Sequence, residues 1–158
     1  MFDEIDGLPL HPLVVHAAVV LVPLAALLGV LFAVPRTRAW ARLPLLLVAV
    51  AAAASTFVAK LSGENLKEAL QLGGRAAELI EEHEARGNLL LILVLVFAVF
   101  AVVGFVVTRT STANSPVVIA IAAALVIGAM AVGVQVYRVG DIGSRAVWNP
   151  TGDTDFSS

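Results

Sequence analysis

Residues 89–107 read LLLILVLVFAVFAVVGFVV, and this stretch decides the fold. It contains no charged side chain and no side chain that forms hydrogen bonds. A helix of this length is about 28 Å long, and the hydrocarbon core of a bilayer is about 30 Å thick. The stretch therefore predicts a transmembrane helix rather than the core of a soluble domain.

Three more apolar stretches have the same character, and they cover residues 13–34, 43–59 and 116–137. The composition agrees with four spans: the 158 residues are 59% hydrophobic and only 14% charged, with a mean hydropathy of +0.95. A soluble domain carries about 25% charged residues, because its surface must be hydrated. We therefore expect an all-α integral membrane protein built as a four-helix bundle, with the lipid bilayer as its surroundings.

The segment between the second and third spans has a helical pattern of its own. Small, apolar or weakly polar residues recur at a 4-3-4 spacing, which is one face of a helix, at Ala76, Ile80, His83 and Gly87. Gly73-Gly74 precedes this pattern as a breaker, and Gly63-Glu64 marks the expected end of the second helix. We expect the third helix to begin outside the membrane and to run unbroken into Leu89, as an extramembrane extension of that span.

No low-complexity linker divides the chain, so we expect a single domain over residues 1–158, with a disordered tail at 149–158. The first six residues, MFDEID, are acidic. A secretory signal peptide begins with basic residues instead. We therefore expect no cleaved signal peptide.

The charged residues are sorted along the chain. The two short loops, 35–42 and 108–115, contain basic residues and no acid: Arg36, Arg38, Arg42 and Arg109. All twelve acidic residues lie in the remaining polar segments, 1–12, 60–88 and 138–158. Short cytoplasmic loops are enriched in Lys and Arg. The pattern predicts a multi-pass protein of the bacterial cytoplasmic membrane, with both termini and the 60–88 loop on the extracytoplasmic side.

Several functional classes lack their chemical signature. The absence of cysteine excludes disulfides, thiolate metal sites and covalently attached haem. A net charge of −2 gives no basic field for nucleic acid. No phosphate-binding loop or nucleophile–base pair is visible, so we expect no independent catalytic activity. The spans hold few polar residues, which disfavours a solute channel or a proton relay across the membrane.

Small residues predict where the helices approach each other, because helix association in lipid depends on close packing. The candidate faces are Ala25-x-x-x-Gly29 in the first helix and Ala129-x-x-x-Gly133 in the fourth. A weak parallel also links the two halves of the chain. Each helical hairpin enters the membrane near a histidine and turns at arginine.

The three histidines and one aspartate are predicted to meet at the outer membrane face. They are His11 and His16 at the start of the first span, His83 before the third, and Asp141 after the fourth. Pro12 favours a helix start and leaves His11 at the cap, one turn before His16. Intramembrane ionisable residues usually face the bundle interior. We therefore expect His16 to point inward, with Gln135, Tyr137 or His83 as its partner.

Neutral imidazole is a ligand for haem iron and for divalent metals. Two imidazoles from different helices, with His16 and His83 as the main candidates, would hold a b-type haem. Alternatively, His11, His16, His83 and Asp141 would form a mixed metal shell. A structural interpretation stays open: each histidine serves only helix capping or packing, and the protein is a cofactor-free accessory subunit of a larger membrane complex.

The opening decapeptide, GLPLHPLVVH at residues 7–16, resembles the HP-x-x-VH start of a bacterial family of predicted four-helix membrane proteins, domain of unknown function 2231. Three further stretches are similar to that family: Ser62-Gly63-Glu64, His83-Glu84 with Gly87, and YRVGDIGSRAVW at 137–148. The resemblance covers residues 7–148. It implies four helices, a bound haem or other redox partner, and an electron-transfer or respiratory setting with membrane redox complex subunits as partners.

The sequence departs from this family at one position. The motif after the fourth helix commonly reads Gly-His-x-Gly, and here Asp141 stands in place of that histidine. The resemblance therefore implies one haem, or a mixed His/Asp metal site, rather than two haems.

Overall fold

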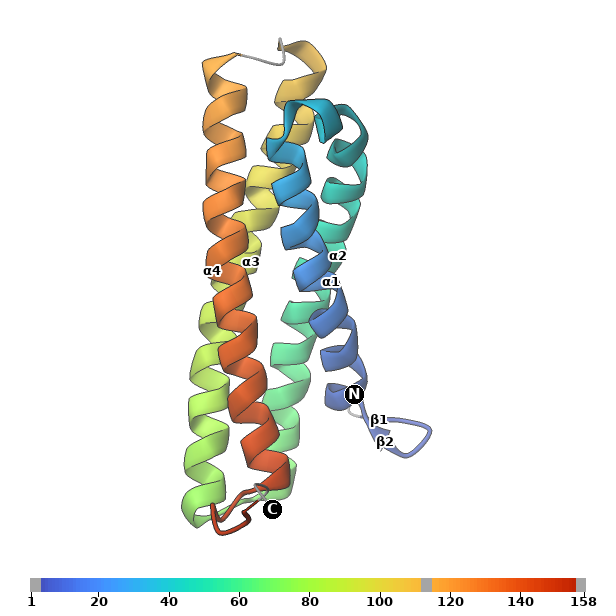
Figure 1. The fold of residues 1–158 in the computed structure, drawn as a ribbon. Helices are drawn as coiled ribbons and strands as arrows, with labels where there is room; N and C mark the ends of the chain where they lie inside the picture. Colours follow the sequence, from blue (N-terminus) through green and yellow to red (C-terminus); the bar gives the residue numbers. More distant parts are fainter. Residues whose placement is uncertain (1–3, 112–114, 156–158) are drawn as a thin grey trace.

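The computed structural model describes residues 4–111 and 115–155. This part of the chain forms a short antiparallel hairpin followed by four long helices (Figure 1): β1 (Glu4–Ile5), β2 (Leu8–Pro9), α1 (Leu10–Ala33), α2 (Pro35–Leu70), α3 (Gly74–Thr110) and α4 (Pro116–Trp148). Each helix is long and apolar enough to cross a membrane. The prediction of an all-α membrane four-helix bundle is confirmed.

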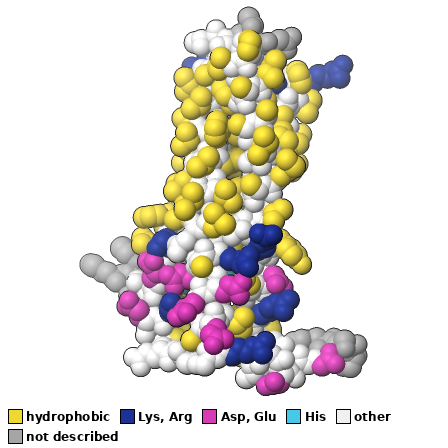
Figure 2. All heavy atoms as spheres, turned by 90° about the vertical axis from the view of Figure 1, so that its left-hand side faces the viewer, with side chains coloured by type: hydrophobic (Ala, Val, Ile, Leu, Met, Phe, Trp, Pro, Cys, Tyr) yellow, Lys and Arg dark blue, Asp and Glu magenta, His cyan; other side chains and the backbone are white. Residues whose placement is uncertain are grey.

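The helices stand side by side in chain order around the bundle. α1 packs against α2 and α4, and α3 packs against the same two helices. α1 and α3 therefore lie diagonally opposite. Charged side chains gather at the end that contains the α2–α3 turn, and a broad hydrophobic band covers most of the remaining length (Figure 2). We call the charged end the polar end.

Three helices, rather than one, extend into the polar end. α3 begins at Gly74 and runs unbroken through Leu89, as expected. The predicted end of the second helix at Gly63-Glu64 is wrong, because α2 continues to Leu70 and stops at Gln71, whose φ of 45° is left-handed. α4 likewise continues past the predicted span to Trp148. The sequence pattern therefore predicted the extension of the third helix but not those of the second and fourth.

The opposite end is closed by the turn between α1 and α2. Pro35 opens α2, where a missing N–H costs nothing, so the predicted loop at 35–42 is helical. The buried guanidinium of Arg38 donates to the backbone oxygens of Phe32 and Ala33, each at 3.0 Å. It also lies 5.6 Å above the Phe32 ring. A cation at the negative end of α1 stabilises that helix terminus, so Arg38 serves as a cap.

Two phenylalanine rings pack closely against glycines, Phe97 in the middle of the bundle and Phe32 near the α1–α2 turn. A Cβ atom built at Gly29 would lie 2.6 Å from Phe97 Cζ, and one at Gly128 would lie 2.9 Å from Phe97 Cδ2. Phe32 packs in the same way on Gly104, at 3.1 Å. The Gly29 face was predicted correctly. Gly133 was predicted to be the close-packing glycine of α4, but a Cβ built there has nothing within 4 Å. Gly128 makes the close contact instead.

A Gly29→Ala substitution should destabilise the bundle, because its methyl group would overlap the Phe97 ring. Overpacking of a core costs about 1–3 kcal/mol. The measurement is unfolding in mild detergent followed by circular dichroism. Gly133→Ala is the matched control and should leave the midpoint unchanged. The double variant Gly29→Ala with Phe97→Leu should recover part of the loss, and additive effects of the two changes would contradict the packing argument.

Candidate functional site

His11 lies in the first turn of α1 and is half-buried against α2. Its Nδ1 donates to the backbone oxygen of Ala59 at 2.9 Å. The ring rests on Gly63, where a built Cβ would lie 2.9 Å from the ring Cε1. Gly63 therefore lies in the interior of α2 and leaves room for the imidazole ring to pack against the helix. It is not the helix end that its residue type suggested.

His83 repeats this arrangement on the other side of the bundle. It lies on α3, and its Nδ1 donates to the backbone oxygen of Val139 on α4 at 3.1 Å. The ring rests on Gly143, with the same 2.9 Å between a built Cβ and Cε1. Each histidine is thus tied to the second helix of its own hairpin.

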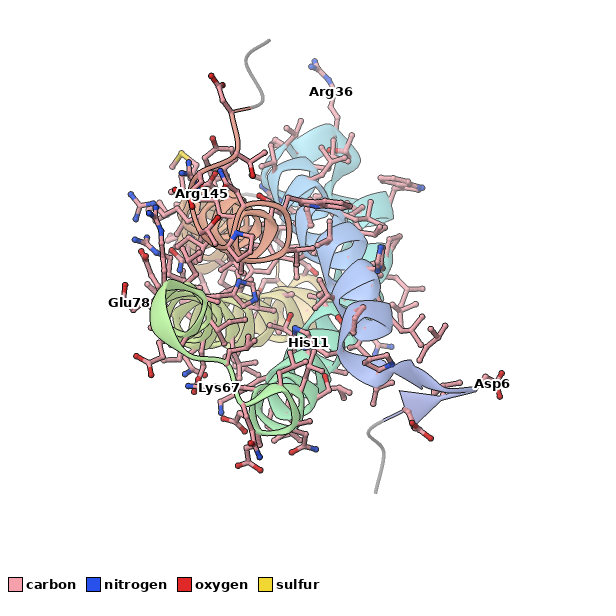
Figure 3. All side chains as sticks on the ribbon, turned by 90° about the horizontal axis from the view of Figure 1, so that it is seen from below. Asp6, His11, Arg36, Lys67, Glu78 and Arg145 are labelled. Carbon is pink, nitrogen blue, oxygen red and sulfur yellow. The ribbon has the colours of Figure 1, made fainter. Side chains whose placement is uncertain are left out.

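The two imidazole rings meet between the hairpins. Their centroids are 6.5 Å apart and their planes are perpendicular. Figure 3, which looks along the bundle from the polar end, shows His11 among the helices while Asp6 and Arg36 point outward. Because α1 and α3 are diagonal neighbours, this pair joins opposite corners of the bundle. We call His11 and His83 the histidine pair.

The surroundings of the histidine pair favour neutral imidazole. Burial is the main cause that lowers the pKa of both His11 and His83, and the bonds to the backbone oxygens of Ala59 and Val139 oppose it. The nearness of His83 lowers the pKa of His11 further. No carboxylate contributes to either shift. Both rings are therefore in the form that binds metals near neutral pH.

The hydrogen bonds also fix which nitrogen is free. A carbonyl oxygen only accepts, so each Nδ1 carries the proton and each neutral ring keeps its lone pair on Nε2. Among the described residues, no hydrogen-bond partner faces either Nε2. In the same part of the chain, the one side-chain polar atom that is both fully buried and without a partner is Asn88 Oδ1. Because neither Nε2 atom has a partner there and neither is in that fully buried class, both are partly accessible.

A small pocket leads to His11 from the polar end. Its volume is about 230 Å³, and it is lined by Glu4, Gly7, Pro9, His11, Ser62, Asn65, Leu66 and Ala69. Ser62 Oγ lies 3.4 Å from His11 Nδ1 and donates to the backbone of its own helix. The β1–β2 hairpin and α2 thus form an entrance beside one histidine.

His16 is not part of the histidine pair. Its side chain is exposed, and its ring nitrogen contacts the backbone oxygen of Pro12 in the same helix. The expectation that His16 points inward is wrong, because α1 already begins at Leu10 and includes His11 in its regular turns. A residue five positions later is rotated by about 140° around the axis. Inward-facing His11 therefore leaves His16 on the outer surface.

The other proposed partners have contacts elsewhere. Asp141 pairs with Arg145 at 3.1 Å on an exposed part of α4. Gln135 is buried and donates to the backbone oxygen of Arg86 at 2.9 Å, which joins α4 to α3. Tyr137 is exposed. Within residues 4–111 and 115–155, no group of three or more His, Cys, Asp or Glu is placed to hold a metal, so the four predicted ligands do not converge.

Sequence reasoning missed the residues that hold the rings, Gly63 and Gly143, together with the carbonyls of Ala59 and Val139. Both glycines lie in the stretches that carry the family resemblance, Ser62-Gly63-Glu64 and residues 137–148. Their association with those motifs was the available signal. It did not indicate which histidine each glycine would meet.

Comparison with known proteins gives one finding on identity. A model of the family described as "Predicted membrane protein (DUF2231)" matches residues 7–154. No curated protein and no solved structure matches the chain. The match spans nearly the whole sequence and includes all four helices, and the chain therefore belongs to the DUF2231 family of predicted membrane proteins.

Proposed function

We propose that this membrane protein binds a b-type haem through His11 and His83 and exchanges electrons at its polar end, in an electron-transfer or respiratory setting. One observation carries the proposal: two neutral imidazoles from diagonal helices, each with a free Nε2, have ring centres 6.5 Å apart. This assignment replaces His16 of the sequence-based hypothesis with His11.

The 6.5 Å between the ring centroids is close to the separation expected for two imidazoles that share one metal ion. Two metal–nitrogen bonds of about 2.0–2.1 Å hold two imidazole nitrogens about 4 Å apart, and each ring centre lies roughly one ångström behind its nitrogen. Two imidazoles that shared one metal ion would therefore have ring centres roughly 6 Å apart. The number of ligands also favours haem, because haem would need only two protein side chains, His11 and His83, whereas zinc sites use three or four protein ligands.

The size of the site sets a condition on haem binding. The pocket beside His11, about 230 Å³, is smaller than the roughly 300–1,000 Å³ of typical ligand pockets. A porphyrin therefore requires side chains around the histidine pair to move aside at the polar end while the two rings keep their separation. α1 contributes only its first turn there, so this rearrangement disrupts less packing than it would in the middle of the bundle.

The residues around the histidine pair would orient and tune the ligands. The carbonyls of Ala59 and Val139 hold each ring in one tautomer and raise the basicity of Nε2. Haem, when bound, supplies one-electron redox chemistry. The apolar core on the membrane side of the pair excludes water from the rest of the bundle. It begins with Leu90 and Val132 and continues deeper to Leu125, Leu45 and Phe32.

We further infer that the polar end faces outward from the bacterial cytoplasmic membrane. Figure 2 shows the hydrophobic band that the bilayer would cover, with charged side chains gathered beyond it at the polar end. At the opposite end the charged residues of the described chain are Arg36, Arg38, Arg42 and Arg109. This distribution follows the rule that Lys and Arg concentrate on the cytoplasmic side.

The alternative function is that of a cofactor-free accessory subunit. Val147 and Trp148, at the polar end of α4, expose 70% and 73% of their surface. Exposed large apolar side chains beyond the hydrophobic band favour contact with another protein. In that case the contact between His11 and His83 serves only to stabilise the packing of the two hairpins against each other.

Haem binding is tested on the protein purified in mild detergent and titrated with haemin. The wild type should develop the Soret band of a six-coordinate, bis-imidazole haem, with sharp visible bands after reduction by dithionite. His11→Ala and His83→Ala should each lose this spectrum, because each removes one axial nitrogen. His16→Ala is the matched control and should keep it, since that ring lies on the outer surface.

Two negative results together would refute the cofactor proposal. The wild type would show no haem spectrum after titration with haemin, and elemental analysis would find no metal after growth with added zinc, copper and iron. Stoichiometric metal without haem would keep the pair as a ligand site and overturn the choice of haem. Loss of the haem spectrum in His16→Ala with retention in His11→Ala would show that the ligands were assigned wrongly.

Orientation is tested with single cysteines, because the natural chain has none and gives no background. Glu78→Cys, at the polar end, should react with a membrane-impermeant maleimide in intact cells from which any outer barrier has been removed. Arg36→Cys, at the opposite end, should react only after the membrane is permeabilised. Both positions are exposed. The reverse pattern of labelling would refute the inferred orientation.

A further inference from the structure

The two halves of the site repeat each other in detail. In each hairpin a histidine near the polar end of the first helix donates from Nδ1 to a backbone oxygen of the second helix, from Ala59 or Val139. The glycine that seats the ring lies four residues after that carbonyl in both cases, at Gly63 and Gly143. A Cβ built on either glycine would lie 2.9 Å from Cε1 and 3.1 Å from Nδ1 of its histidine.

We propose that Gly63 and Gly143 are paired positioning residues, which form two equivalent half-sites and hold both histidines with Nε2 free for one shared ligand. The identity of that ligand rests on the proposed function. The positioning itself does not, because it concerns the geometry of the chain without a ligand. Each hairpin thus contributes one glycine, one carbonyl and one imidazole.

The position of the contact explains why glycine is required. Neither glycine has a positive φ, since the positive-φ glycines among the described residues are Gly7, Gly74 and Gly152. The constraint is therefore space beside the ring. A methyl group would press on the edge that contains Cε1 and Nδ1, so the ring must move away from the atom that makes the hydrogen bond. An imidazole released from its carbonyl then exchanges between tautomers, and the Nε2–H form cannot bind a metal through Nε2.

Other glycines at the polar end do not share this role. A Cβ built at Gly87 or Gly140 has nothing within 4 Å. Gly140 lies on the same helix as Gly143, less than one turn away. Gly140→Ala is therefore a control that adds the same methyl group to the same helix without touching an imidazole.

The experiment compares Gly63→Ala, Gly143→Ala and Gly140→Ala with the wild type, each labelled with ¹⁵N in the histidine rings and held in detergent without haem. In the wild type, His11 and His83 should show a protonated Nδ1 and an unprotonated Nε2. Gly63→Ala should change the His11 signals to those of a mixture of tautomers, and Gly143→Ala should do the same for His83. Gly140→Ala should change neither, and circular dichroism should show helix content equal to wild type in all four.

Haemin titration of the same four proteins gives the second readout. Loss of such an orienting contact typically lowers metal affinity about 10- to 100-fold, so this is the weakening expected for Gly63→Ala and Gly143→Ala, with none for Gly140→Ala. Unchanged ring signals in both folded Gly→Ala variants would overturn the positioning role. If the ring signals change as expected and haemin does not bind the wild type, the proposed function fails and the positioning stands.

Discussion

Close approach of an aromatic ring to a glycine is the contact on which this structure depends. Helices in lipid lack a hydrophobic force that drives them together, so they associate where small residues allow tight packing. In the middle of the bundle, Phe97 packs on Gly29 and Gly128 and joins α3 to α1 and α4. At the polar end, His11 and His83 pack on Gly63 and Gly143. The same contact thus builds both the core and the candidate site.

The phenylalanine contacts in the middle of the bundle and the histidine contacts at the polar end differ in their need for hydrogen bonds. A phenylalanine ring needs no hydrogen bond, whereas a half-buried imidazole must satisfy its nitrogen or lose stability. Each histidine does so with a carbonyl of the neighbouring helix. This bond leaves the second nitrogen available without exposing a charge, because burial favours the neutral ring. Packing and hydrogen bonding together therefore prepare two ligands rather than two buried cations.

The sequence predicted those features that depend on local chemistry. Four apolar stretches gave the four helices, Gly73-Gly74 gave the start of α3, and the apolar stretch at 116–137 gave the start of α4. The end of α2 was not predictable in this way. Gly63 resembles a helix breaker, yet glycine costs a helix interior only about 1 kcal/mol, and a tertiary contact with His11 decides its place. Gly143 posed the same problem, since its meeting with His83 depends on the register of α3 against α4.

The choice between His11 and His16 shows how small a local error can redirect a functional assignment. The two residues lie about 140° apart on a helix, so only one of them can face the interior. Pro12 suggested that the helix begins after His11, whereas α1 begins at Leu10 and includes it. Because the helix begins two residues earlier than predicted, His11 belongs to its regular turns and faces inward, and His16 faces outward. The family motif contains both, and His11 is distinguished by its packing against Gly63 and its bond to Ala59, contacts that no local pattern predicts.

Few polar side chains lie in the described core between the histidine pair and the α1–α2 turn. Beyond the histidine pair, the buried polar side chains of the hydrophobic band are bonded to helix backbones: Thr56 to Ala52 and Gln135 to Arg86. Phe32, Leu45 and Leu125 fill the remaining interior. Among the described residues, the buried polar side chains do not form a continuous chain through this layer, as a path for a solute or a proton would require. A redox group held at the histidine pair would therefore exchange electrons with partners at the polar end or within the plane of the bilayer. Protons or ions that balance a change in its charge would also enter from the polar end, where the pocket beside His11 opens.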